Sequence, residues 1–117
     1  MAENNLDILD RKILANLKGF ARSESFLPRL FATFEEHGLV SLQELENASL
    51  RQDRGALSAV AHRFKGSCLN LGAQALAAHL MMYEERQDPP LAFEAVACRL
   101  AETRDLFVRT CKELKNQ

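Results

Sequence analysis

Residues 54–73, in the middle of the chain, read RGALSAVAHRFKGSCLNLGA. On a helical wheel at ~100° per residue, the apolar side chains of this segment fall in one sector. That sector contains Leu57, Val60, Ala61, Phe64, Cys68 and Leu71. A continuous apolar stripe of this width is typical of a helix that packs against a core. The pattern therefore predicts a core helix over about residues 54–69.

The opposite face of this helix carries an unusual set of side chains. His62 lies roughly 140° from the centre of the apolar stripe. Lys65 and Gly66 follow it by three and four residues, so all three share one exposed face. Gly66 weakens the helix and leaves bare backbone beside the histidine, and a glycine inside a helix needs a reason. The same patch is flanked by Ser58, Ala59, Arg63 and Leu69.

Helical periodicity extends outward from this segment over nearly the whole chain, and no stretch alternates like a strand. Helices are expected over about residues 7–18, 24–49, 54–69, 73–86 and 89–114. Gly19 is expected to end the first of these helices. The second is expected to be capped at its start by Ser23 or Ser25 and the third by Asp53, and the fourth begins after Gly72. The Asp88–Pro89 pair is expected to cap and begin the last helix. Gly38 interrupts the second helix, where we expect a bend or a close helix contact. Short connections between long helices predict an all-α fold, an antiparallel four-helix bundle with an additional short N-terminal helix.

Length and composition are those of one globular domain, which we assign to residues 1–117. The chain is 47% hydrophobic and 26% charged, with a formal net charge of -1. This balance gives no reason to expect binding to nucleic acid or to a membrane. The first residues lack the pattern of a signal peptide, so we expect a cytoplasmic protein. No large apolar surface demands a partner, and we expect a monomer.

The cysteines and histidines give no metal-site pattern. Cys68, Cys98 and Cys111 are odd in number and widely spaced, and each is expected on an apolar helical face as a small core residue. A redox role for Cys68, close to the histidine, is the alternative. The three histidines lie on different predicted helices without the spacing of metal ligands, so neither a metal nor a cofactor is expected.

Residues His62, Lys65 and Gly66 together suit phosphoryl transfer. A neutral imidazole is a nucleophile, and histidine ordinarily has a pKa near 6.5. Phosphoryl transfer requires little from a protein beyond positioning and charge compensation. Lys65 could compensate the charge of a phosphoryl group on His62, and Gly66 clears room for a partner. On physical grounds alone, a solvated His-x-x-Lys pair remains the commoner explanation.

The segment from Ala61 to Ser67, AHRFKGS, followed by NLGA at residues 70–73, resembles the signature of histidine phosphotransfer domains of two-component phosphorelays. Phe64 stands where that family usually has leucine. The resemblance also includes the predicted second helix and covers roughly residues 6–114.

The resemblance implies a four-helix bundle whose exposed His62 accepts a phosphoryl group on Nε2 from a receiver-domain aspartate. The group then passes to the aspartate of another receiver, so the partners are receiver domains of hybrid sensor kinases and response regulators. Mg²⁺ belongs to the receiver. Glu84 matches the position of a glutamine that often holds the imidazole Nδ1, and a solvated surface glutamate is its alternative reading. Wheel position makes Ser58, Ala59, Arg63 and Leu69 candidate receiver contacts.

Two other functions stay open at this point. The first is the phosphotransfer domain of a chemotaxis-type kinase, although a Met1 start and a polar end favour a freestanding protein. The second is a helical adaptor that binds receivers without being phosphorylated. No glycine-rich nucleotide loop occurs, so we expect a phosphoryl carrier without kinase activity of its own, and not an enzyme.

Overall fold

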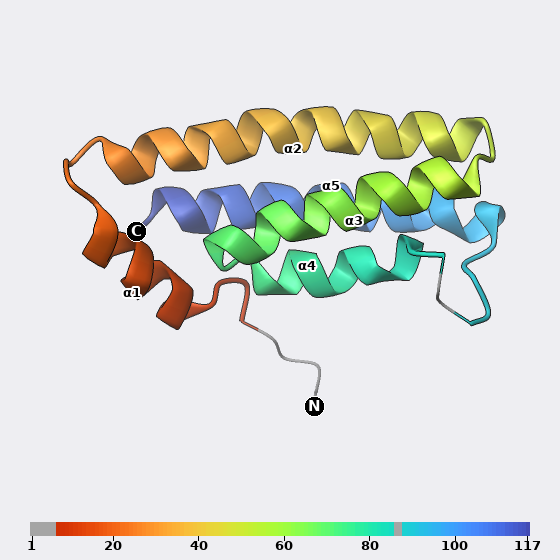
Figure 1. Cartoon of the computed structure of the whole chain (residues 1–117). Coiled ribbons are helices and arrows are strands. Elements are labelled where there is room, and N and C mark those ends of the chain that lie inside the picture. The colour runs from red at the N-terminus through yellow and green to blue at the C-terminus, as the bar shows by residue number, and fades with distance from the viewer. Residues whose placement is uncertain (1–6, 86–87) are drawn as a thin grey trace.

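A computed structural model of the chain describes residues 7–85 and 88–117 (Figure 1). Its elements are α1 (Arg11–Phe20), α2 (Phe26–Leu50), α3 (Arg54–Leu71), α4 (Gln74–Leu80), the 3₁₀ turn η1 (Met81–Tyr83) and α5 (Phe93–Lys115). The described part of the chain contains no strand, and the all-α prediction is confirmed.

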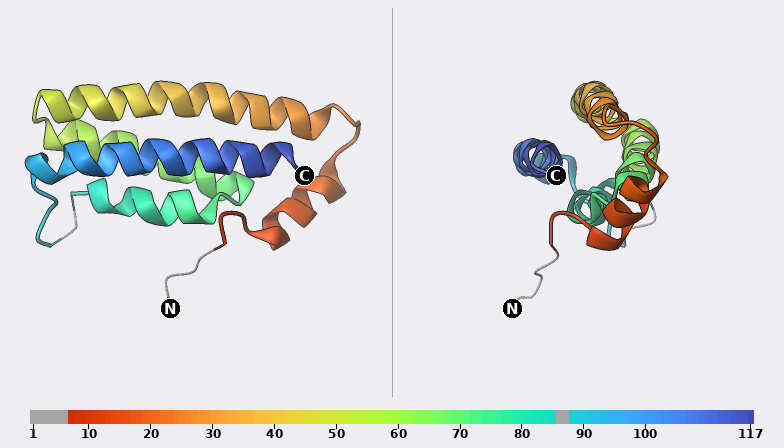
Figure 2. Two further views of the ribbon diagram at one scale, coloured as in Figure 1. Left: turned by 180° about the vertical axis from the view of Figure 1, so that it is seen from behind. Right: turned by 90° about the vertical axis from the view of Figure 1, so that its left-hand side faces the viewer.

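The four elements α2, α3, α4 and α5 run alternately up and down (Figure 1). Seen end-on in Figure 2, they surround a common core, and α1 crosses one end of the bundle beside α3. The predicted stripe of α3 is the buried set of that helix without exception: Leu57, Val60, Ala61, Phe64, Cys68 and Leu71. This burial fixes the rotation of α3 about its axis and therefore fixes which of its residues face solvent.

Two of the helix starts are held by side-chain caps. Asp53 accepts from the backbone N–H of Ala56 and caps α3, as predicted. Asp10 caps α1 in the same way, and this helix therefore begins later than expected, at Arg11. Gly19 lies inside α1 and does not end it. Ser25 occupies the N-cap position of α2 without a side-chain cap, because its hydroxyl pairs with that of Ser23 at 3.2 Å.

Gly72 is the C-cap of α3, and the fourth helix begins after it as predicted; glycine suits this position best. Its φ is 78°, in the left-handed region, and a Cβ here would lie 3.0 Å from the backbone oxygen of Asp10. The N–H of Asp10 donates to the carbonyl of Gly72 at 2.7 Å. The tight turn therefore brings α4 back along α3 and also anchors the segment that precedes α1.

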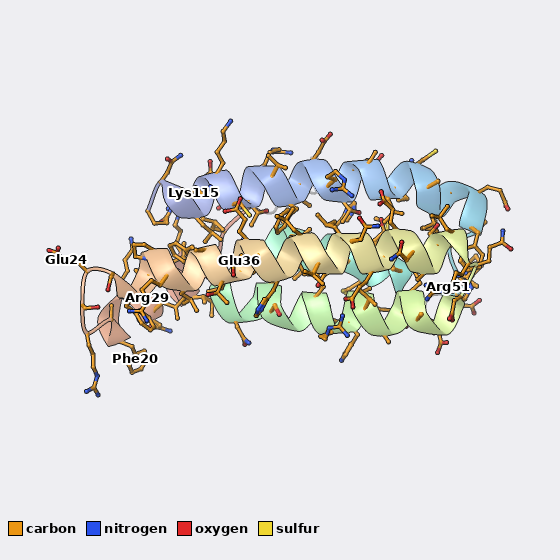
Figure 3. All side chains as sticks on the ribbon, turned by 90° about the horizontal axis from the view of Figure 1, so that it is seen from above. Phe20, Glu24, Arg29, Glu36, Arg51 and Lys115 are labelled. Atoms are coloured by element: carbon orange, nitrogen blue, oxygen red, sulfur yellow. The ribbon has the colours of Figure 1, made fainter. Side chains whose placement is uncertain are left out.

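Gly38 is a point of close contact between α2 and α5. A Cβ on Gly38 would lie 2.2 Å from Cε1 of Phe107, so the ring of Phe107 occupies the space that a side chain would need. That ring also packs against Phe34 and Phe64, with centroid separations of 5.8 and 6.0 Å. Figure 3 looks onto α2, with α5 on one side of it and α3 on the other. Of the two expectations for Gly38, a bend or a close contact, the contact is what the structure shows.

Two predicted boundaries near the loop between α4 and α5 are wrong. The fourth helix was expected to continue to Arg86, a residue outside the described ones, but α4 ends at Leu80 and one 3₁₀ turn follows. Glu84 is then extended, with φ -78° and ψ 144°. The last helix begins at Phe93 rather than after Asp88, because Pro89 precedes a second proline and is disfavoured from helical geometry. Ala92 is the observed N-cap.

The cysteines separate into two buried residues and one exposed residue. Cys68 and Cys111 are buried as expected, whereas Cys98 is exposed, against the prediction. Burial raises the pKa of the Cys68 thiol to about 12, with Cys111 adding to the shift. Because the thiolate is the reactive form, this environment argues against a redox role for Cys68.

Candidate functional site

The side chain of His62 stands out from the middle of α3 into solvent. It is 68% exposed, although it belongs to a helix with a fully buried stripe. The helical wheel placed it there, and the structure agrees. A partner protein can therefore reach the imidazole without any opening of the bundle.

Glu84 approaches His62 from the neighbouring segment. Its Oε1 lies 3.6 Å from Nδ1 of His62, within ion-pair range but longer than a direct hydrogen bond. Only 5% of Glu84 is exposed, so it is not the solvated surface glutamate of the alternative reading. It also lies beyond the helix on which it was expected, because the chain becomes extended at this residue.

Lys65 is the second partner of Glu84. Its Nζ lies 2.6 Å from Oε2 of Glu84, and its side chain is only 13% exposed. The wheel predicted a lysine free to reach outward, whereas the structure folds its stem against the bundle and ties its ammonium to the carboxylate. His62, Lys65 and Glu84 thus form one charged cluster in which the carboxylate bridges the other two.

The backbone at Gly66 is uncovered. A Cβ built on it meets no atom within 4 Å, and the residue is exposed. Ala59 and Leu69 are exposed on the same side of α3, one turn before and two turns after His62, and Leu69 is 52% exposed. Along this side of α3, the surface beside the imidazole therefore offers small or apolar groups, whereas the charged residues Lys65 and Glu84 lie at its Nδ1 side.

The remaining flanking residues have partners within the chain. Arg63 forms an ion pair with Glu44 of α2. The Oγ of Ser58 accepts from the backbone N–H of Glu85 at 2.8 Å, a contact that the sequence did not predict.

Beside His62 the surface is hollowed by an open depression of about 510 Å³, lined by Gly55, Ser58, Ala59, His62, Glu84 and Glu85.

The other two histidines lie away from this cluster. His37 is exposed on α2. His79 is half-buried, and its Nε2 lies 2.6 Å from Oγ1 of Thr103. Burial lowers the pKa of His79, with the charges of Glu102 and Arg99 as smaller opposing and reinforcing causes. Among residues 7–85 and 88–117, no group of three potential ligands is placed to hold a metal ion.

No helix in the described part of the chain combines the length and apolar character that crossing a membrane requires.

A helical bundle that presents one imidazole to solvent beside a lysine and a carboxylate has the architecture of a histidine phosphotransfer protein. The sequence matches the Hpt domain family over residues 29–116, and the chain belongs to that family. The family resemblance predicted from residues 61–73 is thereby confirmed. Proteins of this family carry phosphoryl groups in phosphorelays and interact with receiver domains.

The fold is also similar to a solved structure, that of histidine-containing phosphotransfer protein B from Pseudomonas aeruginosa PAO1. The two align with a TM-score of 0.80 and 27% sequence identity, over 96% of this chain and 95% of that one. A search of curated proteins gave no significant match.

Proposed function

We propose that His62 is the phosphorylated residue of this carrier. It takes a phosphoryl group from an aspartyl phosphate in the receiver domain of a hybrid sensor kinase and passes it to the aspartate of a response-regulator receiver. One observation supports this most strongly: the exposed imidazole at the centre of α3 has a carboxylate at its Nδ1 side and nothing over the adjacent backbone of Gly66. The exchange would take place in the cytoplasm, with this chain as a monomer.

The step itself conserves charge and atoms. The lone pair on Nε2 of a neutral His62 attacks phosphorus, the N–P bond forms, and the P–O bond to the receiver aspartate breaks to release its carboxylate. The proton stays on Nδ1, so the phosphorylated ring gains positive charge. The carboxylate of Glu84, 3.6 Å from that nitrogen, is placed to offset this charge and to favour the tautomer whose Nε2 is free.

Lys65 is placed to act on the phosphoryl group while it remains paired with Glu84. An ammonium has three N–H donors, and the 2.6 Å contact with Oε2 uses one of them. The others can turn toward phosphoryl oxygens on a histidine one helical turn away. Glu84 would then keep the imidazole of His62 and the ammonium of Lys65 close to each other. Lys65 would also balance the negative charge of Glu84.

The receiver would supply the other groups that the transfer needs. Mg²⁺ and the reactive aspartate would come with the receiver, and the chain would act as a carrier without kinase activity of its own. Ala59, Arg63 and Leu69 are the contacts we assign to the docking surface, with Gly66 beneath the approaching active site. Transient partners of this kind need only a small interface.

The test is transfer from a receiver charged with acetyl phosphate. His62→Gln is expected to take up no label, while its circular dichroism and Tm stay close to wild type because the side chain is 68% exposed. His37→Gln, which changes another exposed histidine, serves as the control and should label normally. The label on the wild type should be acid-labile and base-stable. Receiver binding without any label would instead identify a phosphorylation-independent adaptor.

A further inference from the structure

The turn that carries Glu84 is held from both sides by hydrogen bonds outside the charged cluster. On one side, the Tyr83 hydroxyl lies 2.6 Å from Oγ1 of Thr103 in α5. On the other, the backbone N–H of Glu85 donates to Oγ of Ser58 at 2.8 Å. The extended residue between these anchors is the one that reaches His62 and Lys65.

The Tyr83 anchor belongs to the core. Oγ1 of Thr103 donates to the carbonyl of Arg99, so it accepts from the Tyr83 hydroxyl. Burial raises the pKa of Tyr83 to about 12, which keeps the phenol protonated and able to donate. Tyr83 and Thr103 are 1% and 0% exposed, so this bond is part of the packing that makes the bundle stable.

The Ser58 anchor is different, because it joins the turn directly to the helix that carries the histidine. Ser58 lies four residues before His62, one turn along the same face of α3. One rigid helix, α3, therefore sets the position of the imidazole. Through the bond from Ser58 to Glu85, it also sets the position of the backbone at the neighbouring residue, Glu84. Ser58 also lines the depression beside His62, yet its hydroxyl oxygen is already engaged inside the chain.

We propose that Ser58 is a positioning residue: by accepting the Glu85 N–H, it keeps the Glu84 carboxylate against Nδ1 of His62. Wheel position alone makes Ser58 a candidate receiver contact, and the proposal gives it this internal role instead. The inference rests on the proposed function of His62 and adds that the tautomer of the imidazole is set from α3 itself. The bond fixes the backbone next to Glu84, whereas the contacts with His62 and Lys65 hold only the Glu84 side chain.

The test compares Ser58→Ala with Ser58→Thr in the full chain. The first removes the hydroxyl, and the second keeps a hydroxyl oxygen on Cβ. The ¹⁵N chemical shifts of the His62 ring report the tautomer, hydrogen exchange reports the Glu85 N–H, and transfer from a charged receiver gives the rate. Ser58→Ala is expected to reduce the Nδ1–H tautomer, to speed exchange at Glu85 and to slow phosphorylation about fivefold, the scale of one hydrogen bond. Ser58→Thr should restore all three.

A double-mutant comparison separates positioning from docking. In a Glu84→Ala background, Ser58→Ala should slow transfer no further, because its effect passes through the carboxylate. Wild-type tautomer populations and rate in Ser58→Ala would overturn the proposal. A higher Kd for the receiver in Ser58→Ala, with the His62 tautomer unchanged, would also overturn it, because Ser58 would then be a docking contact. Labelling of His62→Gln would instead overturn the proposed function, so the two failures are distinguishable.

Discussion

At the scale of single residues, the main finding is that Glu84 is shared between His62 and Lys65. A carboxylate that is 5% exposed needs a counter-charge, and the ammonium of Lys65 at 2.6 Å supplies one. The lysine therefore has two tasks: it neutralises Glu84 in the resting protein, and we propose that it neutralises the phosphoryl group after transfer. The two tasks predict different effects when the Lys65 side chain is removed.

Lys65→Ala is expected to slow phosphoryl transfer or shorten phosphoryl retention more than it weakens receiver binding. It should also lower the free energy of unfolding, by up to about 3 kcal/mol, because it removes the cation paired with a buried carboxylate. Stopped-flow transfer kinetics and urea unfolding measure the two effects.

The double variant Lys65→Ala, Glu84→Gln provides the control. Replacing the carboxylate by an amide should recover much of the lost stability but not the transfer rate. Equal transfer rates in wild type and Lys65→Ala would remove the lysine from the mechanism.

At the scale of elements, the glycines show how one residue type serves different purposes in neighbouring helices. Gly38 permits α2 to lie against Phe107 of α5, whereas a Cβ added to Gly19 in α1 or to Gly66 in α3 would meet no atom within 4 Å. Helix propensity alone would favour alanine at all three by up to about 1 kcal/mol. At Gly38, packing therefore decides whether a change to alanine stabilises or destabilises the protein.

Gly38→Ala is expected to destabilise the protein by about 1–3 kcal/mol, because a Cβ 2.2 Å from Phe107 forces a core ring to move. Gly19→Ala, the matched control in an open helical position, should leave stability unchanged or raise it by up to about 1 kcal/mol. Thermal and urea unfolding of both variants give the comparison. A stabilised Gly38→Ala protein would mean that α2 and α5 can separate at no cost.

At the scale of the whole molecule, the bundle acts as a rigid support that presents one face of α3 to a partner. Ala59, His62, Gly66 and Leu69 are all exposed along this face. Beside it lies the open depression of about 510 Å³. We propose that a receiver docks here, and the bare backbone of Gly66 is what allows the close approach.

Gly66→Leu is expected to block receiver docking and phosphorylation through bulk, while stability holds or rises because leucine is the better helix former. Receiver affinity by calorimetry and Tm by circular dichroism test both statements. Gly19→Leu, a similar change in α1, should leave affinity unchanged. Unchanged receiver affinity in Gly66→Leu would contradict the clearance argument.

The sequence by itself determined the features that arise within a single helix. The apolar stripe of α3, the cap at Asp53 and the exposure of His62 follow from a 3.6-residue period and local hydrogen bonding, and the structure agrees with each of them. The match to AHRFKGS added the family. It also pointed to Glu84, but only by position along the chain.

Only the tertiary structure decided how the groups around His62 meet. The burial of Glu84, its pairing with Lys65 and the bond from Glu85 to Ser58 all join different segments. They depend on α4 ending at Leu80 and the chain turning extended at Glu84. A helical wheel fixes a residue's direction from its own axis, whereas a contact between segments depends on how turns and packing place one axis against another.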